Sequence, residues 1–98
     1  MIKHIVFWNL KEEAAGGDKI RNGQLIKEKL EGLVGVVPGL LSAQVGVNFN
    51  PNGYDLCLCS ELASKEALDG YQCHPAHLAV KEFVHQVICE RAVVDYEM

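Results

Sequence analysis

The stretch Ile2-Lys3-His4-Ile5-Val6-Phe7-Trp8 decides how this chain can fold. Its β-branched and aromatic residues are typical of a β-strand, in which successive side chains point to opposite faces. The two faces carry Ile2, His4, Val6 and Trp8 on one side and Lys3, Ile5, Phe7 and Asn9 on the other. Because both faces hold large apolar groups, the strand predicts burial on more than one side.

A helix is predicted after this strand. Gly16-Gly17 breaks the chain, and Asp18 is suited to cap the helix because its carboxylate can accept a backbone N–H. The helix is expected to end at Pro38-Gly39. Its predicted buried stripe, at helical spacing, is Ile26, Leu30, Leu33, Val34 and Val37.

The rest of the chain predicts a hairpin, two helical regions and a closing strand. Alternation over Ser42–Phe49 and the turn Asn50-Pro51-Asn52-Gly53 predict an antiparallel hairpin with a third strand over Tyr54–Leu62. Ser64 can cap a short helix that runs to about Gly70. Pro75 suits the first turn of another helix, because its missing N–H costs nothing there. The predicted apolar stripe of this helix is Ala76, Val80, Phe83, Val84, Val87 and Ile88, and the predicted last strand is Arg91–Tyr96.

The order β-α-β-β-α-β predicts an α+β fold, a ferredoxin-like sandwich with an antiparallel sheet and helices on one face. No repeat or linker interrupts the chain, so residues 1–98 are expected to form a single domain. The other sheet face would leave apolar side chains uncovered, which makes it an association surface. Two copies packed through these faces would form a homodimer.

Composition and cysteine usage narrow the function classes. A net charge of −4 and no basic run argue against a nucleic-acid partner. No apolar stretch reaches the roughly 18–20 residues that cross a bilayer, and the start lacks a signal-peptide pattern, so a cytoplasmic protein is expected. The four cysteines are expected to be reduced and mostly packed, because Cys57 and Cys59 share a strand face and should not pair with each other. Cys73, His74 and His77 lack clear zinc-ligand pairs, so no metal is expected. The chain has no P-loop and no Gly-x-Gly-x-x-Gly motif, so no cofactor is expected.

The stretch Tyr71-Gln72-Cys73-His74-Pro75-Ala76-His77, with His4, holds the candidate chemistry. His4 is either a half-buried histidine satisfied by a hydrogen bond or a general base that titrates near neutrality. His77 is either bonded to its own backbone or a proton acceptor kept neutral by the helix dipole. Tyr71 is either an aromatic plug or a hydrogen-bond donor to an enolate oxygen.

Other residues near these groups have structural interpretations. His74 is expected to orient the Pro75 turn, His85 to be a solvated surface residue, and Asp95 to pair with a nearby cation.

Three segments together resemble the stress-responsive A/B barrel domain family: Met1-Ile2-Lys3-His4-Ile5-Val6, Tyr71-x-x-His74-Pro75-x-His77 and Val94-Asp95-Tyr96. The resemblance covers essentially all 98 residues, and the central motif is its most specific part. It implies a dimeric α/β barrel, in which the sheets of two copies form a central barrel with the helices outside. Most members have no assigned biochemical function. Plant members include stress-associated proteins and olivetolic acid cyclase, a cofactor-free enzyme.

The resemblance to that cyclase implies acid/base roles for His4 and His77 and a place in the pocket for Tyr71. The rest of the pocket differs, because leucine or isoleucine replaces a tyrosine, a histidine and a tryptophan of the cyclase, so the same substrate is not expected. The residues expected to line a small, largely apolar substrate pocket are Val6, Trp8, Leu30, Leu56 and Ile88.

Three functions are therefore open. The first is a protein of undefined biochemical role that binds a small apolar or aromatic ligand. The second is a cofactor-free cyclase, lyase or isomerase, with His4 or His77 as the base and Tyr71 as the oxyanion donor. The third and weakest is a cofactor-free monooxygenase of quinol-type aromatics.

Overall fold

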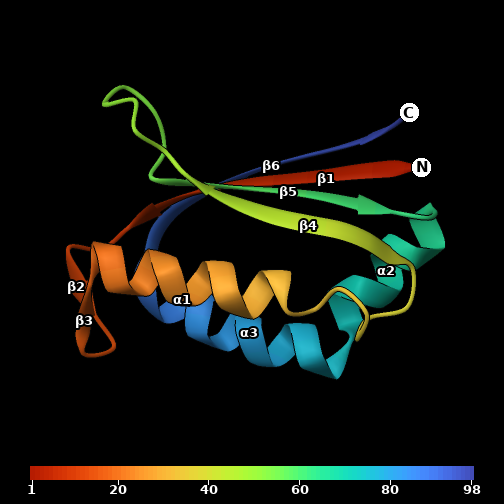
Figure 1. Cartoon of the computed structure of the whole chain (residues 1–98), viewed down its shortest axis with the longest axis horizontal. Coiled ribbons are helices and arrows are strands. Elements are labelled where there is room, and N and C mark those ends of the chain that lie inside the picture. Colours follow the sequence, from red (N-terminus) through yellow and green to blue (C-terminus); the bar gives the residue numbers. More distant parts are fainter.

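A computed structural model describes residues 1–98, and it places all three helices on one face of a four-stranded antiparallel sheet (Figure 1). The strand order is β4-β5-β1-β6. The elements are β1 (Ile2–Leu10), β2 (Glu13–Ala14), β3 (Gly17–Asp18), α1 (Lys19–Glu31), β4 (Leu40–Val47), β5 (Leu56–Leu62), α2 (Lys65–Cys73), α3 (Pro75–Val87) and β6 (Ile88–Glu97). The predicted ferredoxin-like α+β fold is confirmed, with β2 and β3 added as a small separate hairpin.

The strand β1 is the centre of the sheet, because it pairs with β5 on one side and β6 on the other. Its even-numbered side chains, from Ile2 to Leu10, are buried beneath the helices, whereas the odd-numbered ones are only half-buried. At the far end of this pairing the N–H of Met98 donates to the carbonyl of Met1 at 2.9 Å, so residues 1 and 98 lie side by side.

The hydrophobic core lies between the sheet and the helices. Its most enclosed apolar side chains, all at most 2% exposed, are Val6, Ile26, Val45, Leu56, Leu58, Leu62, Tyr71 and Val87. Burial of one such aliphatic side chain stabilises a fold by about 1.5–3 kcal/mol. The core therefore joins the strands β1, β4 and β5 to all three helices.

The predicted end of the first helix at Pro38-Gly39 is wrong. The helix ends at Glu31, and the N–H of Gly32 bonds back to the carbonyl of Glu28 at 3.0 Å. Turns follow, so Val34 is 41% exposed although the stripe pattern predicted its burial. Gly39 has a positive φ of 80°, and a Cβ atom there would lie 2.6 Å from the Cβ of Ala67. Glycine is the residue that accepts both the conformation and the close approach.

The hairpin strands are shorter than the alternation predicted. β4 ends at Val47 rather than Phe49, and β5 begins at Leu56 rather than Tyr54. The intervening loop, residues 48–55, rises above the sheet on the side away from the helices (Figure 1), and Phe49 in this loop is 98% exposed. The side chain of Asn48 accepts from the N–H of Asn50 at 2.8 Å. Such local side-chain bonds compete with the ladder hydrogen bonds of a strand.

Two boundaries in the second half also differ from the predictions. α2 continues to Cys73 rather than ending near Gly70, and β6 begins at Ile88, which had been assigned to the helical stripe. Pro75 opens α3 as predicted. The N-caps Asp18 and Ser64 are confirmed, because their side chains accept backbone N–H bonds at 2.8 and 3.1 Å.

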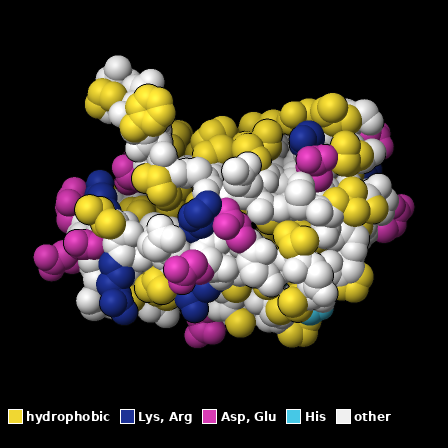
Figure 2. Space-filling model, viewed as in Figure 1, with side chains coloured by type: hydrophobic (Ala, Val, Ile, Leu, Met, Phe, Trp, Pro, Cys, Tyr) yellow, Lys and Arg dark blue, Asp and Glu magenta, His cyan; other side chains and the backbone are white.

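The open face is the side of the sheet that no helix covers. Figure 2 shows hydrophobic side chains along the surface above the sheet and on the projecting loop. The apolar members of the open face, read from the strand register, are Ile5, Phe7, Cys57, Cys59, Ala92, Val94 and Tyr96. None of the helices beneath the sheet is long and apolar enough to cross a membrane.

The four cysteines are free thiols, but they are not packed as predicted. Cys57 is half-buried, and the other three are exposed. The sulfurs of Cys57 and Cys59 lie 3.8 Å apart on the open face, as their spacing on one strand requires. The expectation of mostly packed cysteines is wrong because both strand residues belong to the face without helices.

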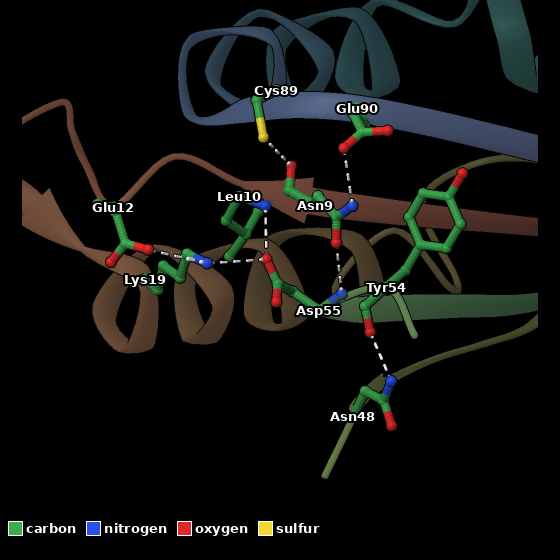
Figure 3. Close-up of polar contacts among 9 residues, drawn as sticks. All are labelled: Asn9, Leu10, Glu12, Lys19, Asn48, Tyr54, Asp55, Cys89 and Glu90. Atoms are coloured by element: carbon green, nitrogen blue, oxygen red, sulfur yellow. Dashed lines mark hydrogen bonds and ion pairs between the residues drawn. The ribbon is translucent and has the colours of Figure 1, made fainter. Parts of the chain in front are cut away.

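Polar contacts fix the base of the projecting loop to the end of β1 (Figure 3). The carboxylate of Asp55 accepts from the N–H of Leu10 at 2.8 Å and lies 3.4 Å from the Lys19 amine. The N–H of Asp55 donates to the side chain of Asn9 at 3.1 Å, and that side chain donates to Glu90 on β6. Asp55 therefore links the loop, β1 and α1.

Replacing Asp55 should destabilise the fold. In the Asp55→Ala variant the N–H of Leu10 loses its partner, so the free energy of unfolding should fall by about 1–3 kcal/mol. Urea denaturation followed by circular dichroism measures it. Glu12→Ala is the matched control, because Glu12 is 89% exposed and contacts the same Lys19, and it should change stability by less than about 0.5 kcal/mol. Equal effects of the two variants would contradict this role of Asp55.

Candidate functional site

A cavity of about 40 Å³ lies between the sheet and the helices. That volume holds roughly three water molecules, since one water needs about 10–15 Å³ on this measure. The residues that line it are His4, Val6, Trp8, Leu30, Leu58, Tyr71, Gln72, His77, Lys81, Val84, His85 and Arg91. Half of this lining is hydrophobic, so the cavity is more polar than the sequence suggested.

His4 reaches the cavity from the buried face of β1. It is 2% exposed, and its Nδ1 contacts a carboxylate oxygen of Asp95, which lies directly opposite on β6. A carboxylate only accepts hydrogen bonds, so Nδ1 carries the proton, and in the neutral ring Nε2 is then the acceptor. Asp95 was expected to pair with a cation, and the structure identifies the histidine as its partner.

Tyr71 lies in the last turns of α2, between the two histidines. Its ring centroid is 5.9 Å from that of His4, in an edge-to-face arrangement, and 4.1 Å from that of His77. The side chain is 1% exposed, and this burial raises the pKa of Tyr71 to about 12. The phenol therefore stays protonated at neutral pH and can act only as a neutral hydrogen-bonding group.

His77 lies in the first turn of α3, where Pro75 and the side chain of His74 begin the helix. The Nδ1 of His74 accepts from the N–H of Ala76 at 3.1 Å, which is the structural role expected of it. Burial, and next the nearby Lys81 cation, lower the pKa of His77 to about 4. His77 is thus neutral at pH 7, and its Nδ1 is buried without a hydrogen-bond partner in the protein.

The structure brings together most, but not all, of the predicted site residues. His4, Tyr71, His77, Val6, Trp8 and Leu30 line the cavity. Leu56 and Ile88, which were also expected in the pocket, are not among the residues that line this cavity. Leu56 is a core side chain opposite Trp8, whereas Leu58, two residues along the same strand face, lies opposite Val6 and takes its place.

The lining residues that sequence reasoning missed are mostly polar. Lys81 and His85 follow His77 at intervals of four residues on α3, so helical periodicity could have found them. Arg91 lies opposite Trp8 in the pairing of β1 with β6. That position depends on the strand register, which the sequence alone did not supply.

Comparison with known proteins gives a family and a fold. The sequence profile of the stress responsive A/B barrel domain matches residues 2–98. A dimeric protein of unknown function from Bacteroides fragilis is 30% identical with a TM-score of 0.88, over 99% of this chain and 95% of that one. A dabb family protein from Mesorhizobium loti is 20% identical with a TM-score of 0.78, over 99% of this chain and 95% of that one. The hydroxynitrile lyase of Passiflora edulis, also 20% identical with a TM-score of 0.78, matches over 97% and 90%. No curated protein matches the chain.

The low pKa of His77 predicts acid sensitivity. Above pH 6.5 the imidazole is neutral whether the chain is folded or unfolded, so stability is complete there. As the pH falls from 6.5 towards 4, only the unfolded chain binds the proton, and the free energy of unfolding should fall by about 3 kcal/mol. Urea denaturation at a series of pH values measures this loss.

The loss should be absent from the His77→Gln variant and retained in His85→Gln, because His85 is exposed. Proton NMR of the histidine rings provides a direct check, with the His77 ring remaining neutral at pH 5.5. Titration of this ring near pH 6.5 would show that the cavity does not exclude the charged form.

Proposed function

The chain belongs to the stress-responsive A/B barrel domain family, and on that premise we propose that it is a homodimer that binds a small molecule in the cavity of each protomer. The Bacteroides fragilis relative, the more similar of those compared, is described as dimeric and of unknown function. This relative supports the dimeric assembly, and the residues that line the cavity of this chain indicate the ligand.

The open face supports the dimer. It has no helix over it, and Val94 and Tyr96 on it are 51% and 44% exposed. A contiguous apolar sheet face is costly to leave in water, and a second copy with the same face covers both at once. A dimer made in this way leaves the helices outside and keeps the two cavities separate.

We propose proton transfer as the chemistry of this site. The observation that carries it is the His4 ring, which lines the cavity while its Nδ1 is bonded to the carboxylate of Asp95. The carboxylate directs the proton to Nδ1, so the Nε2 atom of His4 can remove a proton from a carbon next to a carbonyl group. The electron pair moves to the carbonyl oxygen, and the protonated phenol of Tyr71 can donate a hydrogen bond to that oxygen.

His77 has a different part in this proposal from His4. Its lowered pKa makes it a weak base, and its neutral imidazole suits a hydrogen bond to the ligand better than proton removal. Enolate formation is the shared first step of cyclases and isomerases. A hydroxynitrile lyase has the same fold, so the fold is compatible with lyase chemistry as well.

Dimerisation should depend on the open face. Sedimentation equilibrium at micromolar concentration should give about twice the chain mass of 10.8 kDa. Ile5→Glu places a charge at the centre of the open face and should give monomers. Ile20→Glu, at an 84% exposed position of α1, should remain dimeric. A monomeric wild-type protein, or an Ile5→Glu variant that still forms the same dimer, would count against this assembly.

Acid/base chemistry should be detectable without knowledge of the substrate. In D₂O the protein should exchange the carbon-bound protons of acetone or pyruvate faster than buffer does, as followed by proton NMR. His4→Asn should lower this rate by about 100-fold or more. Arg21→Ala, at an exposed position of α1 that lines neither the cavity nor the hollow beside Asp95, should not change it. Exchange that survives His4→Asn would remove His4 as the base. No exchange in the wild type would leave ligand binding alone as the function.

A further inference from the structure

We propose that the ligand is a small organic carboxylate, whose carboxylate group is held by Lys81 and Arg91 at the mouth of the cavity. This inference rests on the proposed ligand-binding function and adds the chemical class of the ligand. It also changes the sequence-based expectation, which favoured an apolar or aromatic molecule.

The charge of the cavity is opposite to that of the chain. The sequence has 13 acidic and nine basic residues, yet no acidic side chain lines the cavity, whereas Lys81, Arg91 and three histidines do. Asp95 lies behind His4, bonded to its Nδ1. An acidic protein that gathers unopposed cations around one cavity creates a local site for an anion.

Lys81 and Arg91 are free to bind such an anion. Neither forms an ion pair or a side-chain hydrogen bond within the chain, whereas Lys3, Lys19 and Lys27 each pair with a carboxylate. Lys81 comes from α3 and Arg91 from β6, so the two cations approach the cavity from a helix and from the sheet. An arginine and a lysine in this arrangement suit a carboxylate, because the guanidinium can donate two parallel hydrogen bonds to it.

The burial of the lining side chains indicates how the ligand is oriented in the cavity. Lys81 and Arg91 are exposed, whereas His4, Tyr71 and His77 are buried. The charged end of a ligand would therefore remain at the partly hydrated mouth, and its neutral end would contact the three buried rings. His77 Nδ1, which is buried and has no partner in the protein, supports a polar atom of the ligand at the inner end.

The volume of the cavity limits the ligand further. At about 40 Å³ the enclosed part accepts only a few heavy atoms, so the carbon skeleton beyond the carboxylate must be short. A short carboxylic acid that carries a carbonyl group matches the cations at the mouth, the hydrogen-bonding rings inside and the base on β1.

The test compares acetate with acetamide, which has nearly the same shape but no charge. Binding is followed by NMR, through shifts of the histidine ring signals as each probe is added to the intact protein at constant ionic strength. The wild type should bind acetate at least about tenfold more tightly than acetamide, because hydrogen bonds to a charged group are stronger than neutral ones. Lys81→Ala and Arg91→Ala should each weaken acetate binding about tenfold and leave acetamide binding unchanged. Arg21→Ala removes one positive charge from an exposed position of α1 that does not line the cavity, and it should leave the binding of both probes unchanged.

The possible failures can be told apart. Equal binding of acetate and acetamide, or acetate binding that survives both cavity variants, would overturn the carboxylate assignment while leaving a ligand-binding cavity. Acetate binding that falls as much in Arg21→Ala as in Lys81→Ala would show a general surface-charge effect and would also overturn the carboxylate assignment. If neither probe shifts the signals of His4 or His77, the proposed ligand cavity itself fails, and this inference fails with it.

Discussion

The structure depends on one constraint: β1 is hydrogen-bonded on both edges, and its side chains alternate between two different environments. Even-numbered residues enter the space beneath the helices, and odd-numbered residues form the centre of the open face. A register slip of one residue would exchange the two sets and place His4 on the open face. The core, the cavity and the association surface thus share a single strand, and the pairing of β1 with β5 and β6 fixes all three together.

The two buried histidines of the cavity, His4 and His77, differ because strand pairing and α3 give them different neighbours. β6 places a carboxylate against His4, whereas α3 and β6 place cations near His77. Tyr71 lies between them and remains a neutral phenol. When similar groups lie in different environments, their pKa values differ. One of them can then act as a base while another donates a hydrogen bond. The proposal that His4 is the base rests on these neighbours rather than on the histidines themselves.

Local signals in the sequence predicted the elements well, and non-local contacts account for most of what they missed. The caps at Asp18 and Ser64 and the start of α3 at Pro75 depend on neighbouring residues, so they could be predicted. Leu33 and Val37 are spaced as in a helix, so the predicted helix was too long. The turns after Glu31 bury these two side chains without a helix. The strand register places Leu58 rather than Leu56 at the cavity, and it also brings Arg91 there. Neither position could be predicted without that register. Lys81 was different, since its spacing from His77 was already visible in the sequence.

The contact between residues 1 and 98 has a consequence for chain connectivity. β6 and β1 are antiparallel neighbours, and their outer ends are joined by the hydrogen bond from Met98 to Met1. A short turn could connect them as an ordinary β-hairpin, while the exposed loop of residues 48–55 offers a place for new ends. Such a circular permutant would keep every strand pairing and would make the β6–β1 pairing local in sequence. Opening the loop also separates β4 from β5 in sequence, so the permutant exchanges one local hairpin for another, and its contact order should change little.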